Sequence, residues 1–191
     1  YYTTILYSST YNYNYYNFLP NIGTLGTHQP NVINIINAYI LKFDKNYKKI
    51  WGTYYGGNMS TYIPNPYKYN QMYGLQIGKN NDIYIIGVTN AEDNISTSGS
   101  YKETFHQYAY NYNGFIAKLN ENGQRVWGTY FGFDEGLFDT DIQDFHLNQN
   151  DDLYIVGSTE TTTKSKTPNA FLVDNLNYGY LNKFNSEGKF I

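Results

Sequence analysis

Short apolar runs recur along the chain and are separated by polar turns rich in Asn, Gly and Lys. The runs at 83–89 and 153–159 carry apolar side chains on both faces. This pattern is typical of a strand that is central in its sheet and covered on both sides. The run at 5–10 resembles them. We therefore predict three strands of one kind, each buried between two layers.

A second kind of run alternates bulky apolar residues with polar or small ones, at 38–44, 114–120 and 179–185. Such alternation predicts a half-buried strand. Each run leads into a short polar turn, and two of these turns contain Asn-Gly or Glu-Gly. Glycine accepts the positive φ that a hairpin imposes. We expect a hairpin after each of these strands.

The strand expected after the hairpin is nearly identical in two places. It reads Ile-Trp-Gly-Thr-Tyr-Tyr-Gly at 50–56 and Val-Trp-Gly-Thr-Tyr-Phe-Gly at 126–132. Because tryptophan occurs only twice in the chain, this shared context indicates a repeat. Runs at 73–78 and 141–147 supply the remaining strand. If the cycle is lettered a to d from 73–78, the chain reads b-c-d, a-b-c-d, a-b-c.

This order predicts an all-β protein made of blades of four antiparallel strands, and favours a β-propeller over a solenoid of stacked sheets. We treat 1–191 as a single segment: a partial blade at 1–57, a complete blade at 58–132, and a blade at 133–191 whose last strand is cut off. About two and a half to three blades are fewer than the roughly four to eight that close a propeller. We expect a larger ring, completed by further blades of the same chain or by self-association.

Two connecting loops resemble each other and are long enough to carry function. Thr-Leu-Gly-Thr-His-Gln-Pro at 24–30 corresponds to Thr-Ser-Gly-Ser-Tyr-Lys at 97–102. Each of these loops lies between a strand of the first kind and a strand of the second kind. We expect them to occupy corresponding places beside their blades.

A resemblance to a known family rests on three stretches: Gly-Phe-Ile-Ala-Lys-Leu-Asn-Glu-Asn-Gly at 114–123, Trp-Gly-Thr-Tyr-Phe-Gly at 127–132, and 152–159. Together they resemble the bacterial β-propeller repeat family known as SBBP. The Gly26-Thr27-His28-Gln29 loop is similar to versions of that repeat in gliding, surface-protein-rich bacteria of the Bacteroidetes type. The resemblance implies propeller blades, an extracellular or cell-surface location, and a scaffold whose binding role is mostly unassigned.

Composition agrees with a strand-rich and turn-rich fold, since 19% of the residues are aromatic, with 24 Tyr and 17 Gly. A net charge of -3 argues against nucleic acid as a partner, which needs a clustered excess of Lys and Arg. The basic group Lys45, Lys48 and Lys49 falls in a predicted hairpin, where we interpret it as solvated. There is no cysteine for a disulfide, and no apolar run approaches the roughly 20 residues that span a bilayer.

The three histidines, His28, His106 and His146, occupy unlike positions in the cycle. No Gly-x-Ser-x-Gly turn accompanies them, and no two of them have metal-ligand spacing. We predict no catalytic residue. The repeated tryptophans are expected to pack between blades rather than to contact a cofactor.

The acidic group Asp139, Asp141 and Asp144 raises two further hypotheses. Asp139 and Asp141 alternate along one strand face and could contribute oxygens to Ca²⁺, although a solvated acidic loop is favoured. The same carboxylates would serve a propeller hydrolase or lyase acting on polysaccharide. Apart from this calcium hypothesis, no cofactor is expected.

Tyrosines cluster in the connections, with Tyr62, Tyr67 and Tyr69 in one group and Tyr108, Tyr110 and Tyr112 in another. Tyr beside Asn offers a flat apolar face and hydrogen bonds, which suits a glycan or a protein surface. The leading hypothesis is an extracellular, non-enzymatic adhesion or scaffold module. The alternatives are the polysaccharide-acting enzyme and a purely structural surface-fibre repeat.

Overall fold

The computed structural model describes residues 4–9, 21–33, 37–58, 70–105, 112–132, 140–159 and 179–191, and these form an all-β protein. Their strands make three antiparallel sheets. The first contains β1 (Thr4–Ser9), β2 (Ala38–Phe43) and β3 (Lys49–Tyr55). The second contains β4 (Asn70–Ile77), β5 (Ile83–Thr89), β6 (Asn113–Leu119) and β7 (Arg125–Phe131), with the 3-10 turn η1 (Lys79–Asn81) between β4 and β5. The third contains β8 (Thr140–Leu147), β9 (Leu153–Thr159) and β10 (Gly179–Phe184).

Within each sheet, strands that follow one another in the chain lie side by side. The predicted strand order, with three strands, then four, then three, is therefore confirmed. Corresponding strands also share a register, because Lys42 pairs with Trp51 in the first sheet and Lys118 with Trp127 in the second. In both hairpins the register shifts at the next residue toward the turn, between Lys42 and Phe43 and between Lys118 and Leu119.

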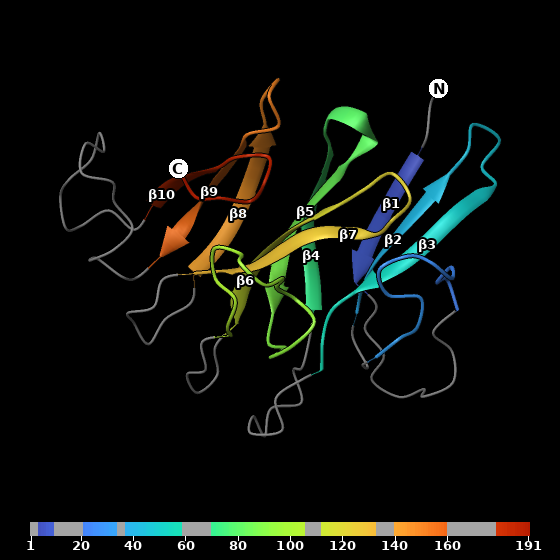
Figure 1. Ribbon diagram of the computed structural model, residues 1–191, viewed down its shortest axis with the longest axis horizontal. Helices are drawn as coiled ribbons and strands as arrows, with labels where there is room; N and C mark the ends of the chain where they lie inside the picture. The colour runs from blue at the N-terminus through green and yellow to red at the C-terminus, as the bar shows by residue number, and fades with distance from the viewer. Residues whose placement is uncertain are drawn as a thin grey trace.

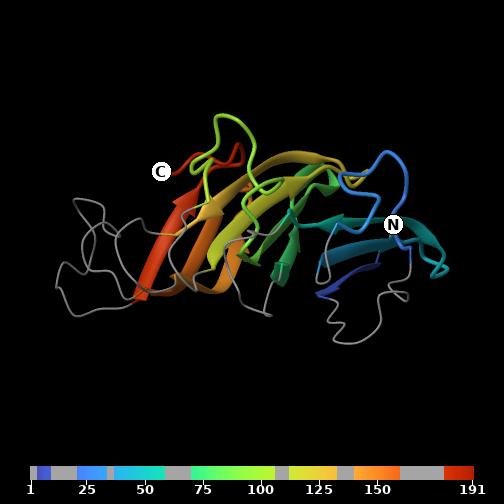
Figure 2. The ribbon, with the colours of Figure 1, turned by 90° about the horizontal axis from the view of Figure 1, so that it is seen from below.

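The three sheets lie next to one another in chain order, with the second sheet between the first and the third (Figures 1 and 2). Apolar side chains of the first and second sheets form one buried cluster, and those of the second and third form another. Each cluster fills the space between two facing sheets. Among the described residues the sheets form no closed barrel or ring.

The strand β5 is buried along its whole length, as predicted, because it has a sheet on either side. The same prediction is wrong for β9. Its Leu153 and Ile155 pack toward the second sheet, but Val156 on the opposite face is 40% exposed. The physical reason is that the far side of β9 faces no described sheet.

The hairpins predicted after the strands of the second kind are confirmed. A side chain at the start of each turn accepts hydrogen bonds from the turn backbone. In the second sheet, Asn120 Oδ1 accepts hydrogen bonds from the N–H groups of Asn122 and Gln124 at 3.0 Å. Gly123 provides the positive φ of 76°. The first sheet uses Asp44 in the same way, with Tyr47 at a φ of 61°.

Candidate functional site

Two loops, at 21–30 and 97–102, run along the outer edges of β3 and β7 and make the same contacts there. Both loops satisfy edge groups that would otherwise face water. In the first sheet the N–H groups of Thr24, Tyr54 and Gln29 donate to Gly52 O, Gln29 O and Thr53 Oγ1. In the second sheet those of Thr97, Tyr130 and Lys102 donate to Gly128 O, Lys102 O and Thr129 Oγ1. The expected correspondence of the two loops is confirmed.

Each tryptophan joins its own sheet to the hairpin of the next. Trp51 Nε1 donates to Glu121 O at 3.0 Å, and Trp127 Nε1 donates to Ser186 O at 3.0 Å. The glycines of those hairpins lie against the indole rings, so that a Cβ at Gly123 would be 3.1 Å from Trp51 and one at Gly188 only 2.8 Å from Trp127. The prediction that the tryptophans pack between sheets is confirmed.

The second of these junctions forms a groove, which we call the rim groove, with a volume of about 220 Å³. Three elements line it: the 97–100 part of the outer loop, the start of β7 and the hairpin after β10. Its residues are Thr97, Ser98, Gly99, Ser100, Val126, Trp127, Glu187, Gly188 and Lys189. The groove exists because consecutive sheets place an edge loop and a hairpin next to each other.

Most polar groups of the rim groove are already engaged. Thr97 Oγ1 donates to Gly128 O, and Lys189 Nζ donates to Gly99 O at 2.6 Å across the groove. Ser100 Oγ differs, because it is buried and has no hydrogen-bond partner. Such groups are rare in folded proteins and cost about 1–3 kcal/mol when left unsatisfied.

The rim groove also has an apolar side, because Val126 is 51% exposed whereas Trp127 is 8% exposed. The indole is therefore covered and offers little open ring face. A ligand would meet the Val126 side chain on one side and hydroxyl, carboxylate and ammonium groups on the other. This mixture suits an uncharged polar molecule with small apolar patches, such as a sugar.

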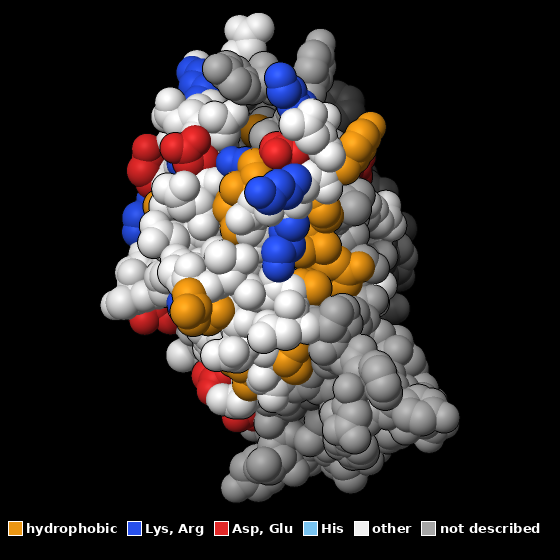
Figure 3. Space-filling model, turned by 90° about the vertical axis from the view of Figure 1, so that its right-hand side faces the viewer, with side chains coloured by type: hydrophobic (Ala, Val, Ile, Leu, Met, Phe, Trp, Pro, Cys, Tyr) orange, Lys and Arg blue, Asp and Glu red, His pale blue; other side chains and the backbone are white. Residues whose placement is uncertain are grey.

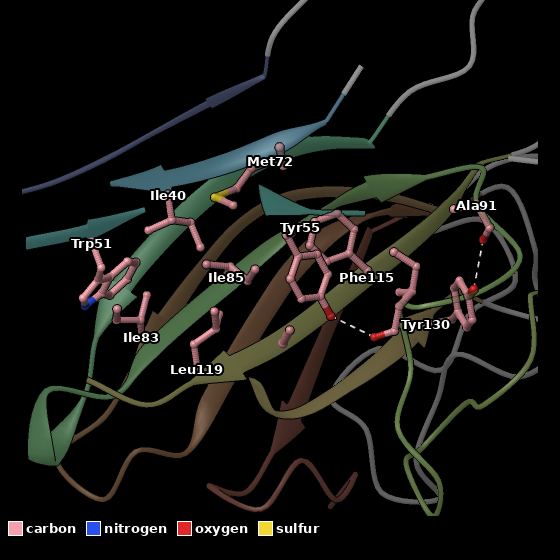
Figure 4. Close-up of a cluster of buried hydrophobic side chains, with 13 residues drawn as sticks. Ile40, Trp51, Tyr55, Met72, Ile83, Ile85, Ala91, Phe115, Leu119 and Tyr130 are labelled. Atoms are coloured by element: carbon pink, nitrogen blue, oxygen red, sulfur yellow. Dashed lines mark hydrogen bonds between the residues drawn. The ribbon is translucent and has the colours of Figure 1, made fainter. Parts of the chain in front are cut away.

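A buried polar network holds the loop after β5 between the first two sheets (Figure 4). Tyr55 Oη donates to Ile95 O at 2.8 Å, and Tyr130 Oη donates to Ala91 O at 2.9 Å. Arg125 also donates to Ile95 O, at 3.1 Å. Burial raises the pKa of Tyr55 to about 12 and raises that of Tyr130 above its usual value. Both hydroxyls therefore stay protonated as donors, which makes the network structural.

His28 lies in the outer loop of the first sheet and packs against Tyr55, with ring centroids 5.1 Å apart. Its backbone N–H donates to Gly123 O in the second sheet. Its Nε2 is buried and has no partner. Burial and the positive charge of Arg125 lower its pKa to about 4. A neutral imidazole buried between loop and sheet fits packing rather than proton transfer.

His146 lies in the third sheet, whereas His28 lies in the outer loop of the first. His146 is an exposed strand residue in β8, as predicted, and His106 falls outside the described residues. The lysines of the basic group, Lys45, Lys48 and Lys49, are exposed in and beside the first hairpin, as expected of a solvated turn.

Of the three acidic residues in the calcium hypothesis, the structure describes the side chain of Asp144 alone. Asp139 falls outside the described residues, and the side chain of Asp141 in β8 is not described. Asp144 is exposed, and its carboxylate accepts the N–H of Phe145 at 2.8 Å. Among the residues that the structure describes, no three acidic or histidine side chains gather in a way that could hold a metal ion.

Most of the predicted tyrosine surface cannot be placed. Tyr62, Tyr67, Tyr69, Tyr108 and Tyr110 all fall outside the described residues. Tyr112 directly precedes β6 and is half-buried. The binding of a ligand by these tyrosines stays a prediction.

The sequence does not predict the rim groove, although it predicts both of its parts. The loop at 97–102 corresponds to that at 24–30, and the turn at 186–189 has the pattern of a hairpin. What brings them together is the packing of the third sheet on the second, which local patterns do not specify. The signal available in the sequence is the run of hydroxyl residues Thr97, Ser98 and Ser100 in a loop that has a counterpart at 24–30.

Across the described part of the chain, no helix combines the length and the apolar character that a bilayer crossing requires. Comparison with protein-family models finds none that matches this chain, and comparison with curated proteins likewise finds no match.

Proposed function

We propose that this chain is a segment of an SBBP-type β-propeller that serves as a non-enzymatic adhesion or scaffold module outside the cell or at its surface, and that its rim groove binds a glycan. The observation that carries the proposal is the rim groove itself, whose lining brings exposed Ser98 of the outer loop together with exposed Glu187 and Lys189 of the hairpin. Beside them lie Thr97 and Ser100 of the loop and the side chain of Val126, which is 51% exposed.

Two features support the propeller part of the proposal. The sheets repeat one strand order, and each faces the next in chain order (Figure 2). Strand β4 lies against β8 where the second and third sheets approach each other. Gln76 on β4 joins the two strands, because its amide donates to Phe145 O and accepts the N–H of Leu147 on β8. Propeller blades approach each other in the same way through their inner strands.

The size of the rim groove supports a small ligand unit. Its volume of about 220 Å³ is below the roughly 300–1,000 Å³ of pockets that enclose drug-sized molecules. A terminal sugar residue of a longer glycan would fit this scale. The remainder of the glycan would extend over the surface of the outer loop and the hairpin.

The hydrolase or lyase alternative gains no specific support from the described residues. Asp144 is exposed and uses its carboxylate to accept a backbone N–H, and the described contacts bring no second carboxylate to it. Glycoside hydrolysis needs two carboxyl groups at a fixed separation across the scissile bond.

Binding of the chain to a printed glycan array, followed by titration of the bound glycans, tests the proposal. Ser98→Ala and Glu187→Gln are expected to weaken binding by about tenfold each, as loss of one hydrogen bond to a ligand does. The matched control is Ser96→Ala, which lies in the same loop, donates to Glu103 O and does not line the rim groove. Absence of binding to every glycan, or equal binding by all variants, would reject the rim groove as a glycan site.

A further inference from the structure

The hairpin of the first sheet differs from the other two at one position of an otherwise identical turn. The N–H groups of Tyr47, Gly123 and Gly188 each donate to the carbonyl three residues earlier, at 3.0 Å. All three residues have a positive φ, which is 61° at Tyr47 and 76° and 75° at the two glycines. The other described residues with a positive φ are glycine, asparagine or aspartate, which adopt it more readily than a bulky residue does. Tyr47 is therefore held in a strained conformation.

Little packing offsets the strain at Tyr47, because its side chain is 81% exposed. At the same turn position, Gly123 and Gly188 leave room for the tryptophan of the preceding sheet. A Cβ there would lie 3.1 Å from the Trp51 ring or 2.8 Å from the Trp127 ring. A tryptophan seated in this way would collide with Tyr47, so the first hairpin is not shaped to receive one. An exposed aromatic ring in a strained conformation points instead to a role at the surface.

The first hairpin also differs from the other two in charge. Residues 44–49 include three lysines and one aspartate, whereas 120–125 and 185–190 each include one basic and one acidic residue. All three lysines are exposed; they are Lys45, Lys48 and Lys49. This hairpin lies at the right-hand edge of Figure 1, and Figure 3, which looks onto that end of the molecule, shows lysine or arginine side chains beside hydrophobic ones. A chain with a net charge of -3 thus carries a local excess of positive charge here.

The carboxylate of this hairpin is used by the turn itself. Asp44 Oδ1 accepts the N–H groups of Asn46 and Lys48 at 2.8 and 2.9 Å. Lys49 Nζ donates to Ile22 O at 3.1 Å, and an ammonium group has two further protons to donate. The hairpin therefore presents an aromatic ring and ammonium groups to a partner.

From these features we infer that the hairpin at 44–49 binds an acidic polysaccharide, with the Tyr47 ring stacked on a sugar and the lysines bonded to carboxylate or sulfate groups. Tyrosine supplies a flat apolar face at low entropy cost, and lysine forms charge-assisted hydrogen bonds with anionic oxygens. A lipid surface fits less well, because Tyr47 has polar neighbours in Asn46 and Lys48, whereas insertion into a bilayer uses several apolar side chains together. The inference concerns a different surface from the rim groove and does not depend on glycan binding there.

Binding of the chain to immobilised dextran sulfate, alginate and neutral dextran, measured by surface plasmon resonance, tests the inference. The wild type is expected to bind at least one of the two acidic polymers and to leave dextran unbound. Dextran sulfate carries sulfate groups and alginate carries carboxylates, so the pair identifies which anion is recognised. Binding should weaken as salt is added, because the charges of exposed lysines are screened.

Variants of Tyr47 separate binding from folding. Tyr47→Gly relieves the strain of the positive φ, so the thermal unfolding midpoint should stay the same or rise. The same change removes the ring, so affinity for the acidic polymer should fall about tenfold. Tyr47→Phe keeps the ring and should bind as the wild type does.

Variants of the lysines test the charge. Lys45→Gln and Lys48→Gln should each weaken binding about threefold at low salt, as loss of one exposed ionic contact does. The matched control is Lys79→Gln, which removes an exposed lysine from the turn η1 of the second sheet and should leave binding unchanged.

Three results would overturn the inference. The first is a wild type that binds the acidic polymers no better than dextran. The second is a Tyr47→Gly variant that binds them as tightly as the wild type does. The third is binding to vesicles that contain phosphatidylserine together with no binding to either acidic polymer, which would assign the hairpin to a lipid surface.

Discussion

At the scale of single residues, two glycines share one backbone conformation and differ in what lies beside them. Gly99 and Gly123 both have a φ of 76°, a backbone conformation that residues with a side chain rarely adopt. A Cβ at Gly99 would have no atom within 4 Å, whereas one at Gly123 would lie 3.1 Å from the Trp51 ring. The comparison therefore separates the cost of the turn from the cost of the contact between sheets.

We predict that Gly99→Ala lowers the free energy of unfolding by about 1–2 kcal/mol, the usual cost of a left-handed conformation for an L-residue. Gly123→Ala should cost distinctly more, because the Trp51 ring must also move and its bond to Glu121 O must stretch. Urea unfolding of both variants measures the difference. Equal losses would mean that the contact between Gly123 and Trp51 contributes nothing.

His28 gives the fold a pH dependence whose sign follows from its lowered pKa. The folded protein keeps the imidazole neutral down to about pH 4, whereas the unfolded chain takes up a proton near the ordinary value of 6.5. As pH falls through this window, the unfolded state binds more protons than the folded state, so stability is lost. Above the window His28 has no effect.

Protonation of His28 is expected to lower the free energy of unfolding by at most about 3 kcal/mol between neutral pH and about pH 4. His28→Phe keeps an aromatic ring against Tyr55 and cannot titrate, so its unfolding free energy should fall less over the same window. Urea unfolding of both proteins at several pH values checks this. Parallel pH profiles for the wild type and His28→Phe would contradict the burial of a neutral His28.

At the scale of elements, the strands and hairpins could be predicted, because hydrophobic alternation and turn residues are local properties. The burial of β5 on both faces also followed from its apolar composition. The exposure of Val156 on β9 could not, since β9 has nearly the same pattern as β5 and differs only in lacking a described neighbour. The rim groove escaped prediction for a similar reason, because its two walls come from different sheets.

The outer loops give a prediction at this scale. Thr129 Oγ1 accepts the N–H of Lys102, and Thr53 Oγ1 accepts that of Gln29. Thr129→Val removes one acceptor with almost no change of shape, at a cost of about 1–3 kcal/mol for the group left unsatisfied. Amide exchange in the 97–102 loop should become faster while the 24–29 loop stays unchanged.

Thr53→Val is the matched control for that experiment, and it should show the reverse pattern. Exchange that accelerates in both loops for either variant would mean that the loops depend on the stability of the whole molecule, and not on their own strand contacts.

At the scale of the whole molecule, the sequence repeat predicted the order of strands in each sheet, whereas the closure of the sheets into a ring stays a prediction. Trp51 and Trp127 could be identified as packing residues because they recur, yet their acceptors, Glu121 O and Ser186 O, are backbone groups with no signal in the sequence.

The central claim is that each sheet is joined to the next through a tryptophan that reaches the following hairpin, and proton NMR of the two indoles tests it most directly. The chain has only two tryptophans, so Trp51→Phe and Trp127→Phe assign both indole N–H signals. We predict that both N–H groups exchange slowly, that Trp51 shows nuclear Overhauser contacts to the Hα atoms of Gly123, and that Trp127 shows them to those of Gly188. Indole protons that exchange as freely as in an unfolded chain, without contacts to either glycine, would contradict the stacked arrangement.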